Sequence, residues 1–347
     1  MNATRRSAFV AAALFGAYVA VVFVGNRMRD DVQIEKIGTG APTRALAGES
    51  ITLLTWNLGY GGLGAESDFS ADGGKHLLPP SRKAVDKNIA GITAELRASA
   101  QDIIIMQEAA RPSLLTRGAD IVGAVGAALN GRDNAFSADF SARFLPRLLR
   151  PQHGLFSSVN AAGVERETIL LPLEPGYIFG VTRRLYHMHV IRLPGASGGW
   201  TVIDIHLSAF DDGANVRLVQ LRSVMAYAER EYERGRHVII GGDWNFEFAR
   251  PDRPTTTDEK FLFWVHPFPY GELGKGWRAA VDPSTPSVRT NERPYVKGQN
   301  FTTVIDGFVI SPNVRAIAVT THDLDFQYAD HQPVSATFMA LDPDNRD

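Results

Sequence analysis

The sequence predicts an α/β protein with one large folded domain behind a short apolar N-terminus. Of its 347 residues, 44% are hydrophobic and 21% are charged, which is the balance of a globular protein. Short apolar runs rich in β-branched residues alternate along the chain with stretches that have the period of an amphipathic helix. The roughly 300 residues that follow the N-terminus are enough to bury a sizeable core.

The composition excludes several kinds of site. The chain has no cysteine, so it has no disulfide framework, thiolate zinc site, iron–sulfur cluster or cysteine nucleophile. Its 36 basic and 38 acidic residues leave a net charge of −2, which argues against coating of nucleic acid by bulk electrostatics. A local basic groove stays open as an alternative.

The N-terminus carries the first organised segment. After a tail of residues 1–7, residues 8–25 (AFVAAALFGAYVAVVFVG) form an 18-residue run without a charge. As a helix this run is about 27 Å long, enough to cross the core of a bilayer. We therefore expect a single transmembrane anchor. A cleaved signal peptide is the alternative, but no small-x-small cleavage site closes the run.

The orientation of this anchor follows weakly from the flanking charges. Arg5 and Arg6 precede the run, and Arg27 and Arg29 follow it, so positive charge is nearly balanced. The very short N-terminal tail favours an N-terminus that stays inside. We therefore expect a single-pass membrane protein whose large domain lies on the outer, periplasmic or extracellular side.

Residues 26–49 are interpreted as a linker, because Gly, Pro, Thr and Ala are scattered there without a sustained period. The folded domain is expected over residues 50–340, followed by a C-terminal tail of residues 341–347. Its first strand is the apolar run Ile51–Trp56. A helix follows from Ser81, which can cap it, with one apolar face made of Val85, Ile89, Ile92 and Leu96.

The later elements repeat this alternation. A second helix is expected over residues 214–234, with Gly235 as its stop, since one face carries Ala214, Leu218, Leu221, Met225 and Ala228. Five more strands are expected, over residues 102–107, 201–207, 237–242, 302–311 and 333–338. Strands interleaved with helices define the α/β class.

Polar residues stand where these strands end or are interrupted. They are Asn57, Glu108, His206, Asp243, Asn245, Asp306, Asp330 and His331. Asp243 and Asn245 are two residues apart, so both can reach one pocket from an extended chain. Taken singly, each residue is more often a turn, cap or core residue than a functional one. Together, and in this order, they indicate one polar site at the strand ends.

These motifs resemble those of a known superfamily. WNLGYGGLG, IIIMQEA, DIHLSAF, IIGGDWNFE, VIDGFVIS and ADHQPVS are similar, in this order, to the motifs of the endonuclease/exonuclease/phosphatase superfamily. The resemblance covers about residues 51–338. It implies a four-layered α/β sandwich of two mixed β-sheets flanked by helices, with the site at one edge. It also implies divalent-metal-dependent hydrolysis of a phosphate ester.

The resemblance also implies a role for each residue. Glu108 and Asn57 are the expected metal ligands, and Asp330 is a further candidate. Mg²⁺ is the expected ion, with Mn²⁺ as an alternative, because Mg²⁺ takes one or two protein carboxylates and keeps several waters. Asp243 is expected to orient and deprotonate the attacking water, and Asn245 to donate its amide to the phosphate.

The two histidines complete the expected catalytic set. The resemblance implies that Asp306 pairs with His331 and holds it as an imidazolium facing the phosphate. It makes His206 a candidate for binding the phosphate or protonating the leaving group.

The sequence departs from the superfamily pattern in two places. Ile205 stands where many members have Thr before the histidine, and Ser157-Ser158 lacks the Arg that often follows Ser. Arg111, three residues after Glu108, is a tentative substrate-binding residue, although a plain solvated Arg explains it equally well.

For two weaker features of the sequence we favour a structural role over a functional one. His187 and His189 have the spacing of two metal ligands on one strand face, but no third ligand is near them in the sequence. Arg143, Arg147 and Arg150 make RFLPRLLR basic. A solvated surface explains this segment, and contact with an anionic substrate or with anionic lipid headgroups is the alternative.

Three functional hypotheses follow. The first is a membrane-anchored, Mg²⁺-dependent phosphoesterase acting on nucleic acid, a phospholipid or a small phosphodiester, with no protein partner inferred. The second is a DNase-type endonuclease, which would need a basic groove beside the pocket to bind DNA, and the sequence does not show such a groove plainly. The third is a non-catalytic binding module, which has no physical need for the intact polar set.

Overall fold

The computed structural model describes most of the chain. The described residues are 3–27, 32–38, 40, 42, 49–141, 144–146, 149–173, 184–195, 198–209 and 213–341. Arg143 and Arg147 lie outside them, as do residues 342–347 of the expected C-terminal tail.

Two β-sheets form the centre of the domain. The first has the strand order β1-β4-β5-β3-β2-β15-β14, the second has the order β10-β13-β9-β8-β7-β6, and β11 pairs with β12 apart from both. Both sheets are mixed, because β2 pairs parallel with β3 and β8 pairs parallel with β9. The bounds of the first sheet are β1 Ile34–Lys36, β2 Ser50–Asn57, β3 Ile103–Ala110, β4 Asp133–Ser141, β5 Gln152–Val159, β14 Val314–Thr321 and β15 Val334–Ala340. The others are β6 Glu165–Leu170, β7 His187–Leu193, β8 Trp200–His206, β9 His237–Asp243, β10 Arg278–Ala280, β11 Val288–Arg289, β12 Thr302–Thr303 and β13 Asp306–Ile310.

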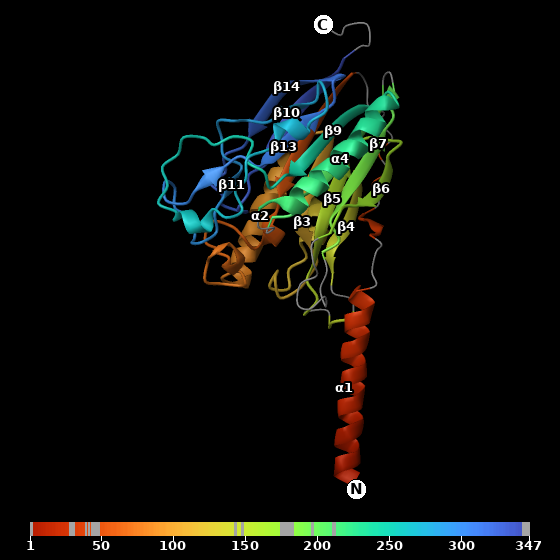
Figure 1. Cartoon of the computed structure of the whole chain (residues 1–347), viewed down its shortest axis with the longest axis vertical. Helices are drawn as coiled ribbons and strands as arrows, with labels where there is room; N and C mark the ends of the chain where they lie inside the picture. Colours follow the sequence, from red (N-terminus) through yellow and green to blue (C-terminus); the bar gives the residue numbers. More distant parts are fainter. Residues whose placement is uncertain are drawn as a thin grey trace.

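Helices cover the outer faces of both sheets, which gives four layers. α2 (Arg82–Ala98) and α3 (Ile121–Ala128) pack on the first sheet, and α4 (Asn215–Glu233) packs on the second (Figure 1). Three buried clusters fill the space between α2, α3 and the first sheet, between the two sheets, and between the second sheet and α4. This arrangement confirms the expected four-layered sandwich of two mixed sheets flanked by helices.

The apolar runs form strands because they are buried on both faces. In β3, Ile103 and Ile105 point into the core between the sheets, while Ile104 and Met106 pack on the helical layer. A strand covered on both faces has a continuous apolar run in place of an alternating one. This burial explains why the expected strands were recognisable without a period.

The two expected helices begin and end close to the expected residues. The side chain of Ser81 accepts a hydrogen bond from the Ala84 amide (3.1 Å) and caps α2. After α4, Gly235 adopts a φ of +83°, the left-handed conformation that glycine tolerates at a helix end.

The expected strand over residues 302–311 is wrong as a single element. It is two strands, because β12 pairs with β11 while β13 pairs with β9. Between them, the amides of Ile305 and Asp306 donate to the Ser287 hydroxyl at 3.0 Å, which interrupts the ladder. Residues 302–311 are buried throughout, so their apolar pattern carried no sign of this change of partner.

The expected linker over residues 26–49 also needs correction. Ile34–Lys36 is a strand that pairs with β4 at the edge of the first sheet, and Glu35 pairs with Arg111 at 2.5 Å. A three-residue edge strand that is mostly exposed leaves no apolar period in the sequence. The folded part of the chain therefore begins before residue 50.

The apolar N-terminal run lies in one long helix. α1 (Ala3–Arg27) leaves the domain and carries the membrane-span candidate Arg5–Gly25, with a mean hydropathy of 2.3 (Figure 1). Length and composition fit a transmembrane span and a signal sequence equally, so the structure leaves both open.

A buried carboxyl group between the sheets gives a testable prediction for stability. Burial raises the pKa of Asp204 well above its ordinary value, and the Gln107 amide donates to its Oδ1 at 2.7 Å. A folded-state pKa above the unfolded one means that this stability is present at low pH and is lost as the pH rises through the folded pKa.

We expect Asp204→Asn to flatten this dependence, because the amide keeps the shape of the neutral acid. The unfolding free energy of the variant minus that of wild type should increase by up to about 1.4 kcal/mol for each pH unit between pH 5 and 7. Unfolding of both proteins at the two pH values measures this. Asp86→Asn on the exposed face of α2 is the control, and parallel pH dependences of wild type and Asp204→Asn would contradict the prediction.

Candidate active site

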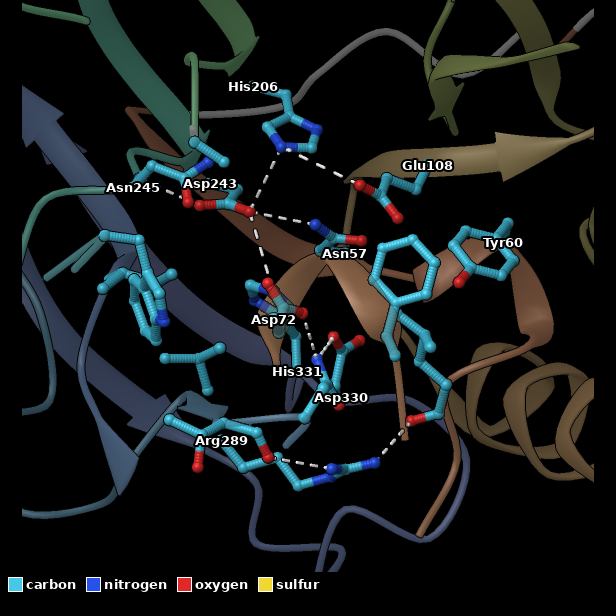
Figure 2. A pocket seen from close by; sticks show the side chains of 18 of the residues that line it. Asn57, Tyr60, Asp72, Glu108, His206, Asp243, Asn245, Arg289, Asp330 and His331 are labelled. Atoms are coloured by element: carbon cyan, nitrogen blue, oxygen red, sulfur yellow. Dashed lines mark hydrogen bonds and ion pairs between the residues drawn. The ribbon is translucent and has the colours of Figure 1, made fainter. Parts of the chain in front are cut away.

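The register of the two sheets gathers the predicted polar residues at one edge of the sandwich. In the second sheet, His206 of β8 and Asp306 of β13 both pair with Asp243 of the strand between them, β9. In the first sheet, Asn57 ends β2 beside the end of β3, which carries Glu108. The Asn57 amide donates to Asp243 Oδ2 at 2.9 Å and so joins the two rows (Figure 2).

Asp243 is the centre of the second-sheet row. Its Oδ2 lies 3.5 Å from His206 Nε2 and 3.7 Å from His331 Nε2. Its Oδ1 accepts a hydrogen bond from the backbone amide of Asn245 at 2.9 Å. Burial raises the pKa of Asp243 to about 7, although His331 opposes this shift. The turn into Asp243 needs Gly242, because its φ is +141° and a Cβ would overlap the Ile205 carbonyl.

His331 and Asp306 form a buried pair. His331 Nδ1 lies 2.8 Å from Asp306 Oδ2. Burial alone would lower the pKa of His331, but Asp306 and Asp243 outweigh it and raise the pKa well above its ordinary value. The imidazolium form of His331 is therefore favoured, with Nδ1 donating to Asp306 and Nε2 directed toward Asp243.

A bulge in β3 turns Glu108 toward the cavity. The register between β3 and β5 shifts between Met106 and Ala109, and Glu108 adopts a φ of +54°. Such a backbone is strained for a residue with a side chain and is common at functional sites. The carboxyl group is 19% exposed, and burial raises its pKa.

Three carboxyl groups, those of Glu108, Asp330 and Asp72, line the same cavity. Asn291 donates to Asp330 Oδ2 at 2.7 Å and to Asp72 Oδ2 at 3.0 Å, which ties these two acids together. Asp330 Oδ1 is buried, and no described residue supplies it with a hydrogen-bond partner. Burial raises the pKa of Asp72 to about 7, with Asp330 and Glu108 adding to the shift. Carboxyl oxygens are the ligands that a hard cation prefers, so these acids fit a site for a cation.

The ring of His206 is held by Arg184. Arg184 Nη2 lies 3.0 Å from His206 Nδ1, and a guanidinium can only donate, so Nδ1 is the acceptor. The proton of the neutral ring is therefore on Nε2, which faces Asp243 and Glu108 (Figure 2). Burial lowers the pKa of His206 well below its ordinary value, and Arg184 adds to this. His206 is thus a neutral donor, unlike His331.

Arg184 is itself fixed from the first sheet. Its Nε donates to Asp139 Oδ2 at 2.8 Å, and His153 Nδ1 lies 3.1 Å from the other oxygen of Asp139. Its guanidinium also lies over the Tyr186 ring, 4.5 Å from the centroid. One planar group therefore bridges Asp139 and His206 at the wall of the cavity.

We expect Arg184→Lys to lower kcat/KM about tenfold without unfolding the protein. A single ammonium cannot donate to Asp139 and His206 in the same fork geometry, so the His206 ring loses its fixed tautomer. Steady-state kinetics with a melting curve measures this, and Arg166→Lys, at an arginine paired with Asp133 away from the cavity, is the matched control. Equal kcat/KM in wild type and Arg184→Lys would show that the bridge is dispensable.

The structure separates the sequence-predicted residues into two groups. All the predicted catalytic and metal residues lie at or beside one cavity, with Asp306 behind His331. Arg111 is not among the described residues that line this cavity. It pairs instead with Glu35 and lies 3.8 Å from Asp120.

The predicted histidine pair is structural. His187 and His189 are buried in β7, and His187 bonds Ser137 (2.8 Å) and the Leu185 carbonyl. Among the described residues, no cluster of metal-ligating groups includes either histidine. The geometry therefore supports a structural role for these two histidines and not a metal-binding one.

Sequence reasoning missed several residues of the cavity. Asp72 ends a short 3-10 helix (Ser70–Asp72) and Asn291 lies in a loop, and nothing in their neighbourhoods distinguishes them from turn residues. Arg184 follows Arg183 in the sequence without a distinguishing pattern. Arg289 also lines the cavity, but its guanidinium donates to the carbonyls of Leu63, Gly64 and Ser67 and so holds the wall in place.

Two groups of side chains could hold a metal ion. Ligand atoms of Asp243, Asp306 and His331 lie within 4.8 Å of one another, the one such cluster among the described residues. In that cluster, however, the Asp306–His331 hydrogen bond already uses one ligand atom of each residue. Both groups hold a buried carboxyl oxygen without a hydrogen-bond partner among the described residues, at Asp306 Oδ1 and at Asp330 Oδ1. The group of Glu108 and Asp330 offers carboxyl oxygens and no imidazole, so its donor set suits a hard divalent ion.

Comparisons with known proteins agree with this fold. The sequence matches the profile of the Endonuclease/Exonuclease/phosphatase family over residues 54–331. No curated protein matches the chain in sequence.

Three solved structures illustrate the likeness of fold. An endonuclease/exonuclease/phosphatase from Beutenbergia cavernae is 15% identical, with a TM-score of 0.52 over 84% of this chain and 72% of that one. TDP2 of D. rerio, complexed with a single-strand DNA product, is 14% identical with a TM-score of 0.53, over 83% and 98% of the two chains. ANGEL2, a 2′,3′-cyclic phosphatase, is 12% identical with a TM-score of 0.54, over 90% and 99%.

The profile match covers most of the chain, and the polar residues that it spans converge at one cavity between the ends of two sheets. The chain therefore belongs to the endonuclease/exonuclease/phosphatase family, whose members are metal-dependent enzymes that hydrolyse phosphoester bonds.

Proposed function

We propose that this protein is a membrane-anchored, Mg²⁺-dependent phosphoesterase that hydrolyses its substrate by attack of water on phosphorus. The observation that carries the proposal is that acids and histidines line one cavity together. Glu108, Asp330 and Asp72 line it with His206, His331 and Asp243. A phosphate ester between them would meet a cation site and a set of hydrogen-bond donors at once.

Glu108 and Asp330 are the residues that would hold the metal. Asn57 would supply its carbonyl oxygen, which already accepts from the Gly59 amide at 3.0 Å and keeps a second lone pair. A bound divalent ion supplies Lewis-acid stabilisation of the charge on the phosphoryl oxygens. Mg²⁺ suits a site with few protein carboxylates, and Mn²⁺ suits the same oxygen ligands.

Asp243 is the proposed base. Its raised pKa lets it take a proton from water near neutral pH, and its Oδ2 is held by Asn57 and faces both histidines. The side-chain amide of Asn245 donates to the Leu207 carbonyl at 2.9 Å and keeps one hydrogen for a phosphate oxygen.

The two histidines would serve different purposes. His331, charged and backed by Asp306, would stabilise negative charge as it builds on the phosphate. His206, neutral and held by Arg184, would donate from Nε2 to a phosphate oxygen without changing its charge. Binding of phosphate is therefore the proposed role of His206, in preference to protonation of the leaving group.

An activity panel tests the proposed function. The full chain in mild detergent would be assayed with Mg²⁺ on bis(p-nitrophenyl) phosphate, single- and double-stranded DNA, RNA, and phospholipid. We expect hydrolysis of at least one phosphoester, and its loss in EDTA with recovery on added Mg²⁺. Hydrolysis that persists in EDTA would contradict the metal, and inactivity on every substrate would favour the binding module.

The anchor gives a separate prediction. Val32 accepts a hydrogen bond from the Thr168 hydroxyl of β6, and α1 contacts the domain through Tyr18, which donates to the Phe144 carbonyl. Because Phe144 lies outside the two sheets, we expect residues 1–31 to be dispensable for the fold. We expect a chain starting at residue 32 to be soluble and to hydrolyse soluble substrates like wild type. The full chain should stay in carbonate-washed membranes.

Two further outcomes sharpen this test. A chain starting at residue 50 also loses β1, which exposes the β4 edge, and should melt at a lower temperature than the chain starting at residue 32. Recovery of the full-length product from the soluble fraction without its first residues would instead identify a signal peptide.

A further inference from the structure

The hairpin that joins β4 to β5 packs against the apolar helix α1. The Tyr18 hydroxyl donates to the Phe144 carbonyl at 2.7 Å, and the Phe144 ring lies so close to Gly25 that a Cβ there would overlap it. Between these two residues, Val22 is only 5% exposed, whereas most of the helix is bare. The tip of the hairpin therefore lies along the last two turns of the proposed membrane span.

This contact sets the depth of the tip relative to a bilayer. Tyr18 precedes Gly25 by seven residues, which is about 10 Å along the helix axis. If the span ends at Gly25, the tip lies at the boundary between headgroups and acyl chains. Phe144 and Leu149 are 53% and 54% exposed there. Arg150 follows, and basic residues beside such a tip favour anionic headgroups.

The chain itself keeps the domain close to the membrane. Val32, which is already bonded to the domain, lies only five positions after Arg27, the end of α1. Five residues reach at most about 17 Å even when fully extended. The edge of the domain that holds β1 therefore stays near the membrane surface.

The base of the same hairpin belongs to the active site. Phe140 pairs with Arg184, and Asp139 holds the guanidinium that lines the cavity and contacts His206. Phe144 lies four positions after Phe140, at most about 14 Å of chain. Figure 1 shows α1 leaving the domain beneath β4 and β5, so the helix and the hairpin lie at the same end of the sandwich.

We propose that the described tip of this hairpin, at Phe144 and Leu149, docks into the leaflet beside α1 and that the cavity acts on a phosphoester carried by a membrane lipid. This proposal rests on the proposed function, including its anchor. Arg184, at the wall of the cavity, is held by Asp139 at the base of the docked hairpin. A lipid headgroup at the membrane surface is therefore within reach of the cavity. The exposed Phe144 and Leu149 then contact lipid in place of water.

Fluorescence quenching tests the docking. The chain has no cysteine, so Phe144→Cys in the full chain can carry one environment-sensitive fluorophore. The control is Ile317→Cys, which is 52% exposed on β14 at the opposite edge of the same sheet. In vesicles of phosphatidylcholine and phosphatidylglycerol brominated on their acyl chains, we expect at least threefold stronger quenching at residue 144. Equal quenching at both sites would overturn the docking.

Kinetics tests the substrate class. Leu149→Glu, which leaves the Phe144 contacts with α1 intact, should lower hydrolysis of phospholipid in vesicles at least tenfold. Its hydrolysis of bis(p-nitrophenyl) phosphate should equal that of wild type, and Ile317→Glu should change neither rate. A wild type that hydrolyses the soluble diester but no phospholipid would overturn this inference and leave the proposed function standing. A wild type that is inactive on both, and also on the DNA and RNA of the activity panel, would overturn the proposed function, while quenching still decides whether the hairpin docks.

Discussion

Glu108→Gln is expected to lower the rate of phosphoester hydrolysis by about 10²–10³-fold or more while leaving the fold intact. Glu108 is the charged ligand that the bulge in β3 aims into the cavity. Gln keeps the length and shape of the side chain, so the strained backbone is preserved, but the charge that would hold a divalent ion is lost. Calorimetric titration with Mg²⁺ should show binding weakened in parallel with the activity.

A carboxylate away from the cavity is the control for this result. Asp86 lies on α2, where it pairs with Arg82 at 2.8 Å, and Asp86→Asn should leave both the metal affinity and the rate unchanged. Full activity or undiminished Mg²⁺ binding in Glu108→Gln would remove Glu108 from the metal site. The ion would then have to bind at Asp243, Asp306 and His331, the other possible cluster.

The second large effect is expected at the buried pair of His331 and Asp306. His331→Ala and Asp306→Asn should each lower kcat by about 10³–10⁴-fold, by analogy with the loss of one member of a catalytic triad. KM should change much less, because the charge on His331 matters most when negative charge builds in the transition state.

The double variant decides whether the two residues act as a unit. Asp306 reaches the substrate only through His331 Nδ1, at 2.8 Å, so removing it after His331 should cost little more. We therefore expect the double variant to match His331→Ala in steady-state kinetics. A loss equal to the product of the two single losses would mean that the residues work independently. Asp282→Asn, at an acid outside the cavity, is the matched control for the change from Asp to Asn.

The elements that could be predicted from the sequence are those buried on both faces or strongly amphipathic. β2, β3, β8 and β9 are central strands with continuous apolar runs, and α2 and α4 have a clear apolar face. Among the strands that escaped prediction, β1, β6 and β10 lie at sheet edges. They are short or partly exposed, so tertiary pairing and not local composition forms them. β5 and β7 also escaped prediction although they are largely buried within their sheets, because Ser and His residues interrupt their apolar runs.

The site divides in the same way. Asn57, Glu108, His206 and Asp243 could be predicted because each follows an apolar strand, and the ends of strands meet at a sheet edge. Asp72 and Arg184 could not, because they reach the cavity from segments whose position depends on distant partners. Asp72 is held by Asn291, and Arg184 by Asp139.

By itself, the sequence determined the fold class, the order of the central strands' polar ends and the apolar character of the N-terminal run. These are properties of short segments, because a buried segment needs apolar residues and its composition therefore shows that it is buried. The resemblance of the sequence motifs had already implied the charged pair of His331 and Asp306, whereas only the tertiary structure decided that His206 is neutral. Arg184 lies far in sequence from the ring of His206 that it contacts, and a pKa depends on the charges that surround a group in space. The same holds for the hairpin beside α1, because its contact with Tyr18 spans 126 residues of chain.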